Sequence, residues 1–127
     1  MTSPADVCRR YLESFATGDP EVIAAHVAEG FVNEHTAALG SGCTGKAEYL
    51  RRLPGFIASM PGLRYEIERQ ICDGEQVANA YTLHATVNDR PIRVRGMMRI
   101  TVRDGLVQDR TDYWDSKVFL QQAGLDG

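Results

Sequence analysis

The sequence predicts an α+β domain, a cone-shaped barrel in which N-terminal helices pack on a curved antiparallel sheet and enclose a hydrophobic cavity. Apolar residues recur at helical spacing in the first 60 residues, whereas from residue 63 they alternate along four long segments separated by tight turns. Helices followed by strands are typical of this class. Strands of about ten residues exceed the usual length, so the sheet should curl. A chain of 127 residues fits a single domain over 1–127.

Two helices are expected before residue 31. The first should cover residues 3–17, because Ser3 can cap a helix whose first turn contains Pro4, and helical spacing places Tyr11 on its inward face. The second should begin at Asp19-Pro20 and end at Gly30. Its buried stripe would consist of Val22, Ile23, His26 and Val27.

A third helix is expected over residues 46–60, with Pro54-Gly55 distorting its middle. Between the second and third helices, residues 31–36 form a short extended segment, followed by a loop of small residues. Alternation along the extended segment places Phe31, Asn33 and His35 on one side.

Four strands then follow, and no further helix is expected. Turns at Asp73-Gly74, Asn88-Asp89 and Asp104-Gly105 separate them. The resulting ladder is an antiparallel meander of residues 63–73, 76–87, 91–102 and 106–116.

The last strand carries the polar residues that decide the functional reading. Alternation sends Arg110, Asp112 and Trp114 to one face. A buried carboxylate is costly unless it is paired, whereas a mixed polar and aromatic face suits the wall of a ligand cavity. The alternative is that Asp112 only pairs with Arg110 at a solvated sheet end.

The concave face of the sheet should form one wall of the cavity, and residues from the first half of the chain should close it. Such a cavity is mainly apolar with a few convergent polar groups, so the ligand should be hydrophobic and carry one or two oxygens. The sheet would contribute Val77, Asn79, Tyr81, Leu83, Ile92, Val94, Gly96, Met98, Arg110, Asp112 and Trp114, and the lid Tyr11, Asn33, His35, Phe56 and Met60.

Composition excludes several classes of partner. With 14 basic and 17 acidic residues, the chain has no basic excess for nucleic acid or an anionic membrane. Its three distant cysteines suggest neither disulfides nor a zinc site, and no cofactor is expected because no Gly-rich phosphate loop occurs. No metal-ligand spacing, secretion signal or membrane span is evident, so a cytoplasmic location is expected.

Short motifs are spread over nearly the whole chain: Arg10-Tyr11, Gly18-Asp19, Phe31-Val32, Gly45, Gly96-Met97-Met98-Arg99, Gly105 and Tyr113-Trp114. Together they resemble the nuclear-transport-factor-two-like superfamily. Its members include ketosteroid isomerases, SnoaL-like polyketide cyclases and limonene-epoxide-hydrolase-like enzymes. This fold supports many chemistries and some non-enzymes, so the resemblance implies the fold more strongly than the activity.

The resemblance to ketosteroid isomerases assigns roles to three positions. Tyr11 falls where that family keeps its oxyanion-binding tyrosine, and His35 falls where it keeps its carboxylate base. Gly96 stands in place of its protonated aspartic acid, so the second oxyanion donor is missing.

The resemblance to limonene-epoxide hydrolases is partial. Asp112 matches one of the two catalytic aspartates, and Asn33 and His35 match the pair that orients water. Val77 and Asn79 replace the arginine and the second aspartate, although Arg110 could supply a guanidinium from the neighbouring strand. SnoaL-like cyclases, which use a His and an Asp in a cofactor-free cavity, fit better as chemistry.

The function expected from these features is cofactor-independent acid/base catalysis, an isomerase or cyclase acting on a polyketide- or steroid-like carbonyl compound. His35 would abstract a proton next to the carbonyl with help from Asp112, and Tyr11 would hold the enolate. Asn79, Tyr81 and Arg110 could hold substrate oxygens.

Two alternatives remain open: an epoxide hydrolase, and a non-catalytic binding protein in which Tyr11, His35 and Trp114 are structural.

A homodimer is expected through the convex face of the sheet. This face mixes apolar and basic side chains, and members of the superfamily commonly dimerise there. Its predicted residues are Ala78, Ala80, Thr82, Arg93, Arg95, Met97, Arg99, Val107, Thr111 and Tyr113.

Overall fold

The computed structural model describes residues 2–126.

The first helix forms as the sequence predicts. Helix α1 (Pro4–Ser14) begins at Ser3, whose hydroxyl accepts a hydrogen bond from the Asp6 amide, and a 3₁₀ turn, η1 (Phe15–Thr17), extends it. Gly18 then adopts the left-handed conformation, with φ of 66°, and ends the helix.

The second helix is much shorter than predicted. Helix α2 (Pro20–Ala24) has only five residues, and strand β1 (Val27–His35) follows almost at once. The expected continuation to Gly30 is therefore wrong. The Val107 amide donates to the His26 carbonyl, and Val27 pairs with Val107, so pairing with the last strand takes these residues out of the helix. A helix as short as the one predicted to end at Gly30 has little stability of its own to oppose this pairing.

Six strands form one curved sheet in the order β2-β1-β6-β5-β4-β3. The predicted antiparallel meander is confirmed, and one parallel pair, β1 with β6, joins it. The parallel pairing is possible because α3 and four strands lie between β1 and β6 in the chain. The remaining strands are β2 (Cys43–Thr44), β3 (Arg64–Asp73), β4 (Gln76–Val87), β5 (Arg90–Arg103) and β6 (Leu106–Trp114).

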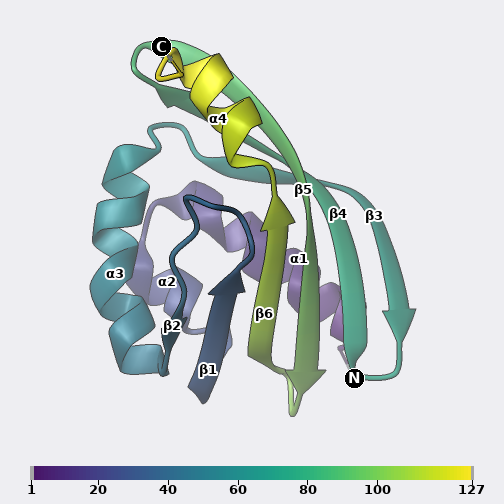
Figure 1. Ribbon diagram of the computed structural model, residues 1–127. Helices are drawn as coiled ribbons and strands as arrows, with labels where there is room; N and C mark the ends of the chain where they lie inside the picture. The colour runs from purple at the N-terminus through teal and green to yellow at the C-terminus, as the bar shows by residue number, and fades with distance from the viewer. Residues whose placement is uncertain (1, 127) are drawn as a thin grey trace.

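A C-terminal helix closes one end of the sheet. Helix α4 (Ser116–Ala123) begins where Asp115 caps the Lys117 amide and ends at Gly124, with φ of 72°. The expectation that the last strand continues to residue 116 with no helix after it is wrong. Figure 1 shows α4 across the end of β5, and the Gln122 side chain bonds both backbone groups of Arg93.

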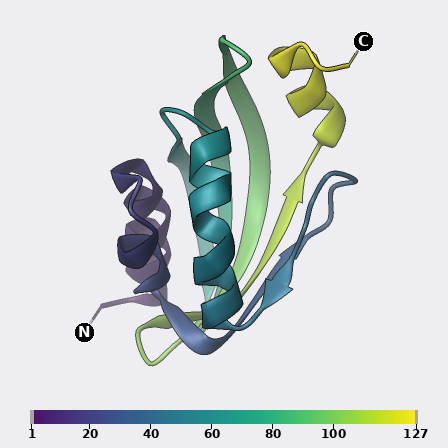
Figure 2. The same ribbon diagram turned by 90° about the vertical axis from the view of Figure 1, so that its left-hand side faces the viewer.

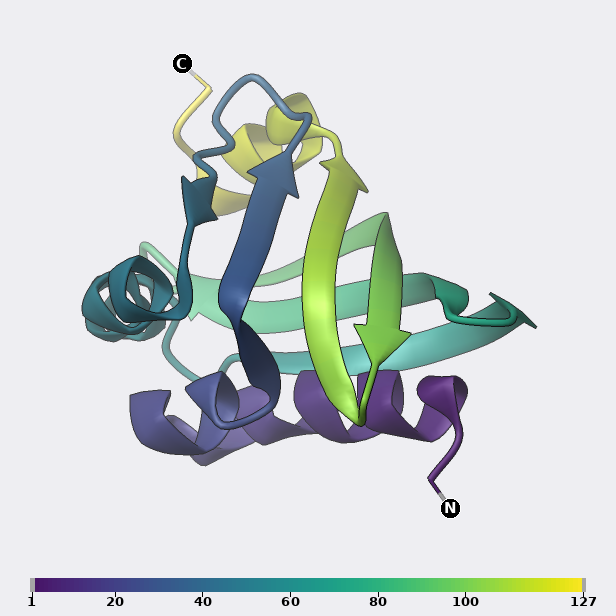
Figure 3. The ribbon, with the colours of Figure 1, turned by 90° about the horizontal axis from the view of Figure 1, so that it is seen from below.

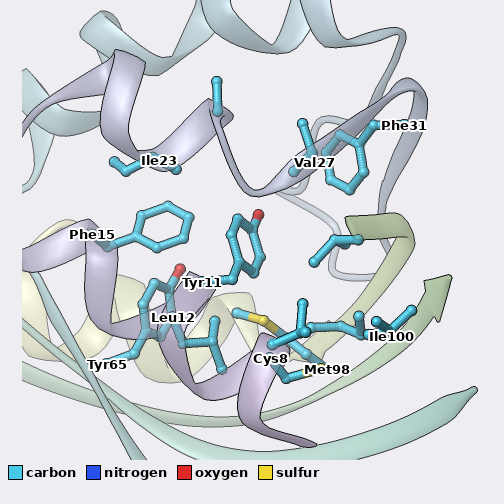
Figure 4. Packing of buried hydrophobic residues seen from close by; sticks show 14 of the residues in the cluster. Cys8, Tyr11, Leu12, Phe15, Ile23, Val27, Phe31, Tyr65, Met98 and Ile100 are labelled. Carbon is cyan, nitrogen blue, oxygen red and sulfur yellow. The ribbon is translucent and has the colours of Figure 1, made fainter. Parts of the chain in front are cut away.

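The helices lie on the concave side of the sheet. Helix α1 runs along the strands beside α2 in Figure 3, and Figure 2 shows α3 (Lys46–Ser59) standing in front of the curved sheet. The core between α1 and the sheet is rich in aromatic residues, as Figure 4 shows around Tyr11 and Phe15. A smaller cluster of Ala85, Ile92, Val94 and Ala123 lies under α4.

The convex face differs from the prediction at Val107. A register shift between Thr101 and Val102 interrupts the alternation, and Val107 is fully buried against Val27. Met97 and Tyr113 do lie on the outside, 38% and 42% exposed. The homodimer through this face stays a prediction.

No helix among residues 2–126 is both long and apolar enough to cross a lipid bilayer.

The inward position of Val107 leads to a stability prediction. Val107→Ala should lower the free energy of unfolding by about 2 kcal/mol more than Val32→Ala, because Val107 has no exposed surface whereas Val32 is 41% exposed. Both positions lie in strands, so the loss of β-propensity is shared. Urea denaturation measures both values, and equal effects would contradict the inward placement.

Candidate active site

A cavity of about 490 Å³ lies inside the cone, between α3, the sheet and α4. Its wall is mainly apolar, with polar side chains gathered where β1 and β6 pair. This is the composition typical of a small-molecule site. The lining consists of His35, Leu39, Gly40, Ser41, Arg52, Phe56, Met60, Tyr65, Tyr81, Leu83, Val94, Asp112, Trp114 and Phe119.

Asp112 is a buried carboxylate in this wall, 2% exposed. The Tyr81 hydroxyl donates to its Oδ1 at 2.5 Å, and Arg110 Nη2 donates to its Oδ2 at 2.9 Å. Arg110 and Asp112 share a face because they are two residues apart on β6. The guanidinium offsets the cost of burying the carboxylate, and each carboxylate oxygen keeps a further lone pair.

Tyr81 reaches Asp112 because its strand neighbour is a glycine. Tyr81 pairs with Gly96 across β4 and β5, and a Cβ at position 96 would collide with the Tyr81 hydroxyl. The phenol therefore occupies the space in which the resemblance to ketosteroid isomerases places an acid. Burial and the neighbouring Asp112 raise the pKa of Tyr81, so its hydroxyl keeps the proton that it donates.

Tyr11 does not line the cavity. Its hydroxyl accepts from Arg110 Nη1 at 2.9 Å and shares a hydrogen bond of 2.6 Å with the Tyr49 hydroxyl. The Tyr11 side chain has no exposed surface, because it lies between α1 and the Arg110 guanidinium. Contrary to the expectation from sequence, Tyr11 supports the arginine instead of facing a ligand.

His35 lies beside Asp112 but is not hydrogen-bonded to it. The two residues are register partners across β1 and β6, yet His35 Nδ1 is 3.7 Å from Asp112 Oδ2, too far for a hydrogen bond. The Trp114 indole N–H donates to Nδ1 at 3.1 Å instead. Burial, and secondly the Arg110 charge, lower the pKa of His35 to about 4, so the imidazole is neutral at pH 7.

The other predicted site residues divide into three groups. Phe56, Met60, Val94 and Trp114 line the cavity as expected. Asn79 and Met98 are fully buried and do not line the cavity; the side-chain oxygen of Asn79 accepts a hydrogen bond from Gln70 Nε2 at 2.9 Å.

Asn33 lines a smaller cavity of about 100 Å³, which shares four residues with the large one: His35, Ser41, Arg52 and Phe56. Arg110 also lines this smaller cavity, and two buried polar atoms, Asn33 Oδ1 and Arg110 Nε, have no partner there.

Several lining residues were not identified from sequence. Tyr65 points inward from β3, which alternation along that strand could have shown, because Leu63, Tyr65 and Ile67 are all turned towards the core. Phe119 lies in α4, a helix that the sequence does not predict. Leu39, Gly40 and Ser41 belong to a loop that has no periodicity to read.

No group of three metal-binding side chains comes together among residues 2–126.

Comparison with known families identifies the chain. The sequence model of the SnoaL-like domain matches residues 8–110. The chain belongs to the SnoaL-like domain family. No curated protein matches this SnoaL-like domain in sequence.

Solved structures share the fold of this SnoaL-like domain. A Catenulispora acidiphila protein with a ketosteroid isomerase-like fold, in complex with trimethylamine, is 17% identical, with TM-score 0.87 over 98% of this chain and 95% of that one. A candidate ketosteroid isomerase from Kribbella flavida is 29% identical, with TM-score 0.68 and coverage of 87% and 76%. An LEH-like epoxide hydrolase from M. tuberculosis is 19% identical, with TM-score 0.79 and coverage of 94% and 90%.

The nuclear-transport-factor-two-like fold is thereby confirmed, and proteins that share it include candidate isomerases, candidate polyketide cyclases and an epoxide hydrolase.

The buried ion pair of the SnoaL-like domain leads to a second stability prediction. Arg110→Met should lower the free energy of unfolding by about 3–5 kcal/mol, because it leaves the Asp112 carboxylate buried without a cation. Adding Asp112→Asn should restore part of this loss, since an amide needs no countercharge. Denaturation at pH 7 measures both variants. A cost below about 1 kcal/mol for the single variant would show that Asp112 does not depend on Arg110.

The lowered pKa of His35 leads to a pH prediction. Between the unfolded value of 6.5 and the folded value of about 4, the unfolded chain binds more protons. Stability should therefore fall as the pH drops from 6.5 to 4, by about 3 kcal/mol from His35 alone, and stay level above that range. His35→Asn should lack this part of the pH dependence. Parallel urea titrations of both proteins from pH 4 to 8 measure it, and curves of equal slope would contradict the burial of a neutral His35.

Proposed function

We propose that this SnoaL-like domain is a cofactor-independent acid/base enzyme, an isomerase or cyclase that acts on a hydrophobic carbonyl compound of polyketide- or steroid-like kind. The observation that carries the proposal is the Asp112 carboxylate, held by Tyr81 and Arg110 in the wall of an apolar cavity of about 490 Å³. A fixed carboxylate in a dry site can remove a proton from a carbon beside a carbonyl.

The roles differ from those that the sequence suggested. His35 was expected to be the base, but Asp112 is the only acidic residue among residues 2–126 that lines the large cavity, and two hydrogen bonds fix its carboxylate there. We therefore assign the role of base to Asp112. Tyr11 acts behind Arg110 and holds the guanidinium in place. The enolate oxygen would be received by donors of the cavity wall, among which His35 and Tyr65 lie on the side of Asp112.

The comparisons support the reaction class. Proteins of the same fold are described as a candidate ketosteroid isomerase and a candidate polyketide cyclase. Isomerisation of a ketone through its enolate and aldol-type cyclisation both begin with removal of a proton next to a carbonyl group. Such chemistry requires no cofactor, only a placed base and donors for the developing charge.

Epoxide hydrolysis is the second candidate, and one observation favours it. Asn33 and Arg110 line the small side cavity, and within residues 2–126 Asn33 Oδ1 and Arg110 Nε are buried without hydrogen-bond partners; a bound water molecule needs two to four polar partners. The fold is also that of an LEH-like epoxide hydrolase. Turnover in oxygen-18 water separates the two, because only hydrolysis transfers solvent oxygen to the product.

The proposal can be tested without the natural substrate. A bicyclic ketone such as 1-decalone, incubated with the protein in D2O, should exchange its α-protons, as followed by NMR. Asp112→Asn should slow this exchange by about 10²–10⁴-fold and leave binding of the ketone within a few-fold.

The matched control is Asp109→Asn, the same change on the same strand outside the cavity lining, where Asp109 bonds Thr101. Equal rates in the wild type and Asp112→Asn would end the assignment of the base. Binding without exchange in the wild type would favour a non-catalytic binding protein.

A further inference from the structure

Trp114, the only tryptophan of the chain, makes a polar contact that the proposed reaction has not yet used. Its Nε1 lies 3.1 Å from His35 Nδ1, and the two rings meet edge to face with an interplanar angle of 86°. An indole N–H can only donate a hydrogen bond. His35 Nδ1 must therefore be the bare, accepting nitrogen, and the imidazole proton lies on Nε2.

Two groups compete for His35 Nδ1, and the distances decide between them. Asp112 Oδ2 would favour a proton on Nδ1, but it lies 3.7 Å away and already accepts from Arg110. Trp114 is within hydrogen-bond length and favours a bare Nδ1. Phe119 of α4 is a further ring neighbour of the indole and meets it edge to face, with centroids 6.3 Å apart, but it makes no hydrogen bond to either ring within residues 2–126.

The opposite nitrogen of His35 is available to a ligand. The His35 ring borders both the large cavity and the small one, and its Nε2 makes no hydrogen bond within residues 2–126. Together with the neutral state of the ring, this leaves an uncharged N–H group free in the polar part of the cavity.

We propose that Trp114 is a positioning residue that holds His35 in the Nε2–H tautomer and so makes the imidazole a neutral hydrogen-bond donor to the substrate carbonyl oxygen. The inference rests on the proposed function, and it specifies the ligand group as an uncharged oxygen acceptor such as a ketone.

With His35 as a neutral donor, every proton that moves in the reaction is accounted for. Asp112 accepts the proton from the α-carbon, the electrons of the broken C–H bond form the carbon–carbon double bond of the enolate, and the carbonyl π electrons move onto the oxygen. The enolate oxygen accepts a hydrogen bond from His35 Nε2 without taking its proton. Asp112 then returns the proton to carbon. A neutral donor suits this cycle because it keeps its own proton throughout.

The tautomer of His35 can be measured without any ligand. Long-range ¹H–¹⁵N NMR of the labelled protein at pH 7 distinguishes the protonated ring nitrogen from the bare one. We expect a protonated Nε2 in His35 of the wild type. Trp114→Phe removes the donor but keeps an aromatic ring, so Asp112 becomes the nearest partner of Nδ1. The Nδ1–H tautomer should then increase at least tenfold relative to Nε2–H.

Phe119→Leu is the matched control, because it changes another ring that packs on Trp114 and keeps the indole N–H that donates to His35; the tautomer should not change. In the ketone exchange assay, Trp114→Phe should lower the rate in proportion to the Nε2–H population that is lost, up to the limit of about 10²-fold that complete loss of one oxyanion donor costs, with binding within a few-fold.

A wild-type protein with the proton on Nδ1, or an unchanged tautomer in Trp114→Phe, would overturn the inference. The wild-type measurement needs no variant, so it decides even if Trp114→Phe does not fold. Failure of the proposed function would give a different result. The His35 tautomer would be as expected, but Asp112→Asn would exchange the α-protons of the ketone as fast as the wild type.

Discussion

The structure depends on one buried ion pair, that of Arg110 with Asp112 on the last strand. Both side chains are almost fully removed from water, where each charge alone would cost several kcal/mol. The surrounding residues are arranged to satisfy this pair: Tyr81 donates to the carboxylate, and Tyr11, backed by Tyr49, accepts from the guanidinium. Gly96 belongs to the same arrangement, because only a glycine leaves room for the Tyr81 hydroxyl.

The ion pair also determines what the neighbouring histidine can do. Arg110 adds to the effect of burial in keeping His35 uncharged, and Asp112 is too far away to accept a hydrogen bond from Nδ1 and so hold the imidazole proton there. A charged pair, Arg110 with Asp112, and a neutral pair, Trp114 with His35, therefore lie side by side, and Asp112, His35 and Trp114 line the large cavity. Proton removal from carbon needs both kinds of group, a fixed anion to take the proton and a neutral donor to receive the charge that develops on oxygen.

Much of the fold could be predicted from the sequence because its signals are local. Ser3 and Pro4 mark a helix start whatever surrounds them, and the turns at Asp73-Gly74, Asn88-Asp89 and Asp104-Gly105 delimit strands β3 to β6 to within about a residue at most ends. The errors are those of long-range competition. Residues after Ala24 have a helical apolar pattern, but β6 pairs with them and makes a strand. The sequence does not predict α4, because its cap, Asp115, falls within the segment 106–116 that is expected to be the last strand.

The candidate site shows the same division. The sequence by itself determined that Arg110, Asp112 and Trp114 share one face of a strand, because side chains alternate with a period of two. Only the tertiary structure decided that Tyr81 and not Tyr11 reaches the carboxylate, and that Trp114 and not Asp112 bonds His35. Those partners come from separate strands, and contacts between them depend on register and on differences of less than 1 Å, which no local pattern encodes.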